Sequence, residues 1–208
     1  MKTNKLQYTI VYRSKDNIWG KYNHKLKFKN QKWKKLLFKL DRKRTFFFTR
    51  RPRSSKVLSR LRLMTKQKFK SFYGHLPYAT LKREYKAVKK ITSYHLVDNL
   101  LISLERRLDV FLFRSGLFTS IFEAQQLIKH HQIKVNNQIV SNSNFKMSSG
   151  DFIQIPPANL KKSGQMLPYL QINYSLSLLI FLRNPQVKEI KYPFSLNLKF
   201  LIGYLNKK

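Results

Sequence analysis

The sequence predicts an α+β protein in which helices come first and a small β-sheet follows. Apolar residues recur at helical spacing from about residue 60 to residue 131, with interruptions at Gly74 and Gly116. After residue 132, short segments that alternate apolar and polar residues are separated by turn residues, as is typical of strands. We therefore expect a basic arm (1–59), a helical domain (60–96), a domain of helices and strands (97–156) and a C-terminal part (157–208).

The charge of the chain indicates a polyanionic partner. Its 43 Lys and Arg residues face only 9 acidic residues, which gives a net charge of +34. Residues 1–90 hold 29 of the basic and 3 of the acidic side chains. A compact protein with this imbalance repels itself unless an anion neutralises it. We expect nucleic acid, bound tightly and with a steep salt dependence, in preference to a membrane surface.

Several kinds of site are not expected. The chain has no cysteine, which excludes disulfides and thiolate metal sites, and its five histidines show no ligand spacing beyond one adjacent pair. The longest apolar runs are far shorter than the ~20 residues that cross a bilayer. The sequence therefore predicts no metal, no cofactor, no membrane segment and no secretion signal.

The arm and the helical domain are both rich in basic residues. In the arm, basic and aromatic residues alternate without a sustained period, as in Lys25–Lys29 and Arg42–Phe48, so we expect it to become ordered on its partner. Its aromatic rings either stack on bases or pack against the protein. The helical pattern from Arg60 to Lys90 is broken once, at Gly74–Pro77. After the break, an apolar stripe of Leu81, Tyr85 and Val88 is expected to face the core. The basic residues off the stripe are expected to face phosphates: Lys82, Arg83, Lys86, Lys89 and Lys90.

A single helix is predicted from Val97 to about Ser115, because its apolar residues recur at steps of three and four. Arg107 and Arg114 lie two turns apart on this helix, so both should project from one side and meet one RNA backbone groove. The alternative is a solvated arginine pair balanced by Glu105 and Asp109.

A second helix is predicted from Ile121 to about His131. Ser120 and Glu123 form a capping box at its start. Gln126, Lys129 and His130 have the spacing of one exposed patch, and Phe122, Leu127 and Ile128 can supply the buried side.

Strands are predicted after this helix. Asn136–Asn137 suits a two-residue hairpin turn, since asparagine tolerates positive backbone angles. A further strand is expected at Phe152–Ile155 and more within 169–182. The apolar segment 194–205 should dock on the body of the protein.

Three stretches carry a family resemblance: LERRLDVFLFRSGLF (104–118), EAQQLIKHHQIKVNN (123–137) and KMSSGDFIQI (146–155). In order and spacing they resemble the RNA-binding module of the small-subunit ribosomal protein S four family, the S-four domain. The flanks KQKFKSFYGHL (66–76) and LIGYLNKK (201–208) are similar to the same family. The resemblance implies two helices packed on a small sheet, and a C-terminal tail that returns to the helical domain.

The resemblance also implies a function. Members are structural constituents of the small ribosomal subunit that bind its rRNA early in assembly, at a junction in the 5′ part. They lie near the mRNA entrance, beside ribosomal protein S five, so mRNA is a further expected partner. The residues expected to bind RNA here are Lys66, Lys68, Tyr73, Arg107, Arg114, Gln126, Lys129, His130, Lys134, Asn136 and Lys146.

Departures from the family pattern indicate an organelle-encoded member. Gln125 stands where the family usually has arginine, and Asn137 replaces the turn glycine. Few alanines and glycines beside abundant Lys, Asn, Phe, Ile and Tyr suggest AT-rich coding. A mitochondrial ribosome is therefore expected, with a plastid as the alternative.

Two other functions are left open. Arg107-Leu108-Asp109 is similar to the segment around the catalytic aspartate of pseudouridine synthases, which would make the chain an RNA-modifying enzyme. The rest of the chain is too short and basic for a separate catalytic domain, so we expect no enzymatic activity. A free translation or stress factor would use the same module on stalled ribosomes, and its stoichiometry would distinguish it.

Overall fold

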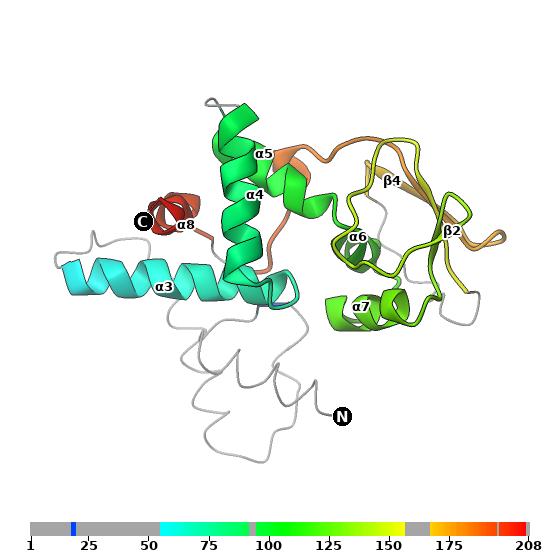
Figure 1. The fold of residues 1–208 in the computed structure, drawn as a ribbon, viewed down its shortest axis with the longest axis horizontal. Coiled ribbons are helices and arrows are strands. Elements are labelled where there is room, and N and C mark those ends of the chain that lie inside the picture. The colour runs from blue at the N-terminus through cyan, green and yellow to red at the C-terminus, as the bar shows by residue number, and fades with distance from the viewer. Residues whose placement is uncertain (1–17, 20–54, 92–94, 157–166, 195, 207–208) are drawn as a thin grey trace, which may run out of the picture. The chain divides into compact units, whose positions relative to one another are not determined.

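The computed structural model describes residues 18–19, 55–91, 95–156, 167–194 and 196–206 (Figure 1). The chain forms two compact units. Residues 1–80 and 191–208 form one, called here the helical unit, and residues 81–190 form the other, called the sheet unit. The chain thus enters the helical unit, builds the whole sheet unit, and then returns. Most of the predicted basic arm lies outside the described residues.

In the helical unit, helix α3 (Ser55–Phe72) packs against helix α8 (Leu198–Leu205) (Figure 1). Gly74 and His75 both have positive φ angles, 69° and 59°, and break the chain before helix α4 (Tyr78–Ile91), as predicted. Phe72 meets Phe194 with ring centroids 5.8 Å apart. The predicted docking of the apolar C-terminal segment and its return to the helical part are confirmed.

The sheet unit contains most of α4, followed by helices α5 (Leu96–Glu105), α6 (Leu108–Arg114) and α7 (Ile121–Lys129). The prediction of one helix from Val97 to Ser115 is wrong, because the chain breaks between α5 and α6. Arg107 is extended there (φ −67°, ψ 137°) and forms a β-bridge with Lys146. Backbone bonds to the loop around Lys146 therefore replace the helical ones, as in Leu108 N–H to Phe145 O (2.8 Å).

Helix α7 begins as predicted and ends earlier. The Ser120 hydroxyl accepts a hydrogen bond from the Glu123 N–H (3.2 Å), and the Glu123 carboxylate accepts from the N–H and hydroxyl of Thr119. The helix stops at Lys129, and His131 takes a left-handed φ of 57°. Its fully buried side consists of Ile121, Ala124 and Ile128. Of the three residues predicted for this side, Ile128 is buried, while Phe122 and Leu127 are half-buried.

Five short antiparallel strands form one sheet in the order β2-β1-β3-β5-β4. Their bounds are β1 Lys134–Val135, β2 Gln138–Ile139, β3 Phe152–Gln154, β4 Leu170–Asn173 and β5 Leu178–Phe181. A short 3-10 helix, η2 (Val187–Glu189), follows. Asn136 and Asn137 have φ angles of 50° and 66°, which confirms the predicted hairpin turn.

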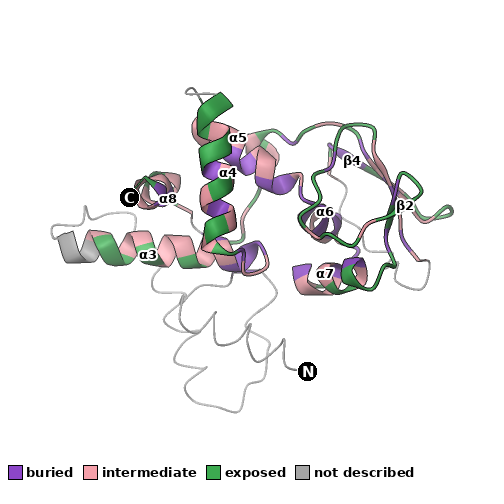
Figure 2. Ribbon diagram, viewed as in Figure 1, coloured by how far each residue is buried: buried purple, intermediate pink, exposed green. Residues whose placement is uncertain are grey.

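One face of the sheet packs on α6 and α7 and forms the core of the sheet unit (Figure 2). Ile153 lies between its strand partners Val135 and Leu179, and all three are buried. The rings of Phe111 on α6 and Phe181 on β5 meet edge to face at 5.2 Å. Each fully buried side chain of this size contributes about 1.5–3 kcal/mol. The predicted α+β class, with two helices on a small sheet, is confirmed.

Candidate nucleic-acid interface

The break between α5 and α6 is held by a buried ion pair. The Arg107 guanidinium donates from Nε and Nη2 to the two carboxylate oxygens of Asp109, at 3.1 and 2.7 Å. The Arg107 side chain is 6% exposed and that of Asp109 is 0% exposed. Gln125 donates to the same carboxylate (2.7 Å), and so does the Val110 N–H (2.9 Å). Burial raises the pKa of Asp109, although the Arg107 charge and these donors oppose the shift.

Arg114 is held by a second ion pair. Its Nε and Nη2 donate to both carboxylate oxygens of Glu105, at 2.9 and 2.8 Å. Glu105 lies on α5 and is buried, and the Arg114 side chain is only 14% exposed. Because α5 and α6 are separate helices, the prediction that Arg107 and Arg114 project from one side of a single helix is wrong. The alternative, an arginine pair balanced by Glu105 and Asp109, is right about these two partners and wrong about solvation, since both arginines are largely buried.

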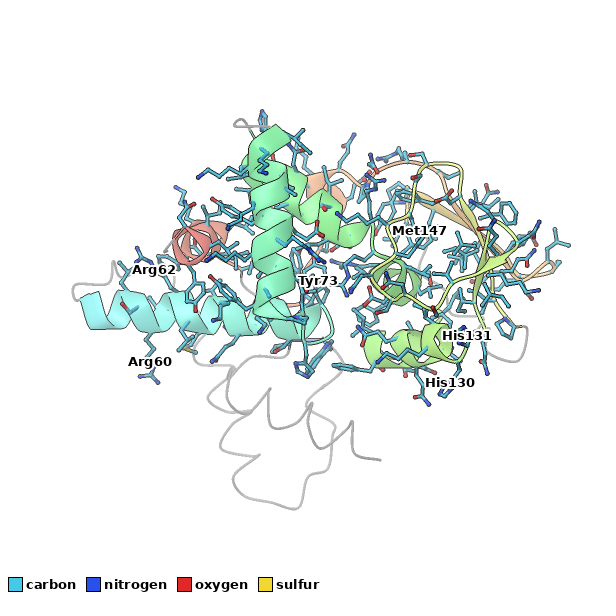
Figure 3. All side chains as sticks on the ribbon, in the orientation of Figure 1. Arg60, Arg62, Tyr73, His130, His131 and Met147 are labelled. Carbon is cyan, nitrogen blue, oxygen red and sulfur yellow. The ribbon has the colours of Figure 1, made fainter. Side chains whose placement is uncertain are left out.

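Four of the predicted RNA-binding residues form an exposed group at the end of α7 and the start of β1. They are Gln126, Lys129, His130 and Lys134. Figure 3 shows His130 and its neighbour His131 where α7 ends. The group, called here the α7 patch, contains two lysines and no carboxylate. The arrangement suits binding to phosphate and sugar groups, which accept hydrogen bonds from such donors.

Asn136 and Lys146, also predicted to bind RNA, make contacts within the sheet unit. The Asn136 amide donates to Asp151 (2.9 Å), and its oxygen accepts from the Phe152 N–H (3.1 Å). The Lys146 ammonium lies 2.6 Å from a Glu84 oxygen and 3.1 Å from the Ser103 hydroxyl. These bonds fix the hairpin turn and attach the loop before β3 to α4 and α5.

Two predicted site residues of the helical unit, Lys66 and Tyr73, also make contacts within the protein. The Lys66 ammonium lies 4.0 Å from the ring centroid of Tyr204 and 5.0 Å from that of Tyr78. Tyr73 is 0% exposed, and its hydroxyl lies 2.6 Å from that of Tyr192 (Figure 3). Lys68 is half-buried on α3. The position of Tyr73 leaves its ring no room to stack on a base.

Helix α4 presents a second basic surface that the candidate residues did not include. Its buried residues are Leu81 and Tyr85, as predicted, while Val88 of the predicted stripe is half-buried. The basic residues exposed on the other side, called here the α4 face, are Arg83, Lys86, Lys89 and Lys90. Lys82, which was predicted to belong to this set, is half-buried. The sequence carried this signal in the charges beside the stripe. It also contained the partners of Arg107 and Arg114, Asp109 and Glu105, but did not show that both ion pairs are buried.

Every carboxylate of the described residues is already bonded within the sheet unit. Its seven acidic residues and their partners are Glu84 with Lys146, Asp98 with His95, Glu105 with Arg114, Asp109 with Arg107, Glu123 with Thr119, Asp151 with Asn136 and Glu189 with Arg183. The described carboxylates therefore bond to groups of the protein itself, while basic side chains are exposed on the α4 face and the α7 patch. A surface of this kind attracts a polyanion.

The described residues offer no group of three or more His, Asp or Glu side chains that could hold a metal ion. None of the helices in the described ranges is both long and apolar enough to cross a membrane.

Comparisons with known proteins agree with this arrangement. Residues 106–153 match the family described as the S4 domain. The chain is 33% identical over 155 residues to the small ribosomal subunit protein uS4m of Marchantia polymorpha. The match covers 68% of this chain and 76% of that protein. The chain belongs to the uS4 family of small ribosomal subunit proteins.

Other uS4 relatives are mitochondrial or bacterial. The uS4m protein of Reclinomonas americana is 35% identical over 160 residues, and this chain spans 63% of its length. The uS4 protein of Orientia tsutsugamushi is 31% identical over 153 residues and is matched over 73% of its length. The resemblance to the S-four family seen in the sequence is thereby confirmed.

Proposed function

We propose that this chain is a structural, non-enzymatic constituent of the small subunit of a mitochondrial ribosome and binds the rRNA of that subunit. The observation that carries the proposal is the similarity to relatives named uS4m, at 35% and 33% identity. Bacterial uS4 proteins are also among the relatives, and a plastid ribosome is the alternative.

Binding is electrostatic and dictated by shape. A-form RNA hides its base edges in a narrow major groove, so the contacts go mainly to phosphates and sugars. The α4 face and the α7 patch supply lysines and arginines for these contacts, with the amide of Gln126 and the imidazole of His130 beside them. Each neutralised phosphate releases counterions, which makes the binding strongly dependent on salt.

The predicted site residues divide into two roles under this proposal. Gln126, Lys129, His130 and Lys134 contact RNA directly, because their side chains are exposed. Six others fix the shape of the two units through the contacts described above: Arg107, Arg114, Asn136, Lys146, Lys66 and Tyr73. Lys68, half-buried on α3, is assigned to neither role.

The family resemblance suggests a finer position within the subunit. We propose that the chain binds a junction of RNA helices in the 5′ part of the rRNA, close to the mRNA entrance and to ribosomal protein S five. Two compact units joined in one chain suit a junction, since each can bind a different RNA segment.

Sedimentation tests the proposal. Mitochondrial lysate is separated on a high-salt sucrose gradient, and this protein is quantified by mass spectrometry against other small-subunit proteins. Constant one-to-one abundance in the small-subunit and monosome fractions is expected. Substoichiometric or salt-stripped protein would contradict the proposal and favour a free factor, and the same pattern in plastid fractions would correct the compartment.

A further inference from the structure

The described part of the helical unit contains no carboxylate. Residues 55–80 and 191–206 hold eight Lys and Arg side chains and neither Asp nor Glu. Six of the eight lie on α3, where Arg62, Lys66 and Lys70 follow one another at spacings of four. Like charges at this spacing destabilise a helix, and no acidic residue stands in the first turn to offset them. Helix α3 therefore needs stabilisation from elsewhere in the fold.

Helix α8 supplies this stabilisation with apolar and aromatic groups. Leu201 and Leu205 are buried, at 1% and 3% exposure, where α8 packs on α3. Gly203 of α8 lies against Arg62, whose Nε would be 3.5 Å from a Cβ added at that glycine, an ordinary van der Waals distance. Figure 3 shows Arg62 on the side of α3 that faces α8, and Arg60 pointing away.

The contact between Tyr204 and Lys66 shows how α8 holds a positive charge of α3. Tyr204 lies beneath the ammonium at 4.0 Å, its hydroxyl is 2.5 Å from Nζ, and Tyr78 meets the Tyr204 ring edge to face at 5.7 Å. An aromatic face attracts a cation without carrying a negative charge. Lys66 is thus held in place while the net charge of the helical unit is unchanged.

We propose that α8 is the element that keeps the basic helix α3 folded without cancelling its charge, so that α3 becomes an ordered polyanion-binding surface only when α8 has docked. Residues 191–206 follow the entire sheet unit in the chain. The helical unit is therefore completed after the sheet unit during synthesis, and it opens and closes as a separate step.

Hydrogen exchange on the whole 208-residue chain without RNA tests the proposal, so its outcome does not depend on the ribosomal role. The variants are Leu201→Ala, which removes buried apolar contact, and Tyr204→Leu, which keeps bulk and removes the cation–aromatic contact. Lys199→Ala, an exposed position on the same helix, is the matched control.

Both test variants should raise the exchange rates of α3 amides at least tenfold, with Leu201→Ala the stronger, while the amides of β3 and β5 keep their rates. Lys199→Ala should change neither. Unchanged α3 exchange in both variants would overturn the proposal. Equal acceleration in α3 and in the strands would also overturn it, because the two units would then open together.

Discussion

At the scale of single residues, buried charge explains why two arginines that match the family pattern differ in role from exposed lysines. Arg107 and Arg114 are paired with Asp109 and Glu105, partners that lie two and nine positions away in the sequence. Only the break between α5 and α6 brings Glu105 to Arg114. A sequence pattern shows the residue types but not this break, so the arginines could be predicted to matter and their burial could not.

Removing Arg107 should destabilise the sheet unit. Arg107→Ala leaves the Asp109 carboxylate buried without its cation, which typically costs about 3–5 kcal/mol. Urea unfolding measures this loss. Adding Asp109→Asn to the Arg107→Ala protein should recover part of the lost stability, because the unpaired charge is then gone. A stable Arg107→Ala protein that no longer binds RNA would contradict the structural role.

The lysines of the α7 patch should affect RNA affinity and leave stability unchanged. Lys129→Ala and Lys134→Ala are each expected to lower the slope of log affinity against log salt by about 1, for many RNA sequences alike. Filter binding at several salt concentrations measures the slope. Lys188→Ala, an exposed lysine on η2, is the matched control and should have a smaller effect. Loss of affinity for one base identity alone would argue against phosphate binding.

His75 should make the helical unit less stable in acid. Burial and the nearby Lys70 charge lower the pKa of His75 below its usual value of 6.5. The folded state therefore binds this proton less readily than the unfolded state, and stability is lost as the pH falls below about 6.5. Thermal unfolding from about pH 7.5 to about pH 5.5 should show a smaller decrease for His75→Asn, which tolerates the positive φ angle. An identical pH dependence in both proteins would refute this role.

At the scale of elements, the boundaries set by neighbouring residues were predicted from the sequence, and the boundary set by a distant residue was not. The break after α3, the start of α7 and the Asn136–Asn137 hairpin depend on turn and capping residues next to the element itself. The end of α5 depends on a β-bridge from Arg107 to Lys146, thirty-nine positions later. A helical period that continues across such a bridge cannot reveal it.

The cap of α7 offers a test at this scale. Ser120→Ala removes the acceptor of the Glu123 N–H bond and should destabilise the sheet unit by about 1 kcal/mol. Chemical denaturation measures the change, and Ser149→Ala in an exposed turn should leave stability unaltered. A Ser120→Ala protein as stable as its parent would show that Glu123 and Thr119 suffice as the cap.

At the scale of the whole molecule, the arrangement of charge connects fold and function. The acidic residues of the described part are bonded internally and lie in the sheet unit, while Lys66 of the helical unit is held by aromatic rings. Composition alone predicted a polyanionic partner, because a net charge of +34 needs one. It could not show which basic side chains remain exposed, since that depends on pairing in three dimensions.

The central claim is that the α4 face and the α7 patch bind small-subunit rRNA. Ultraviolet crosslinking of isolated small subunits, followed by mass spectrometry of the peptides attached to RNA, tests it most directly. Crosslinks to small-subunit rRNA are expected in peptides that contain residues 83–90 and 126–134. Crosslinks confined to peptides outside these two surfaces, or their absence in subunits that contain the protein, would contradict it.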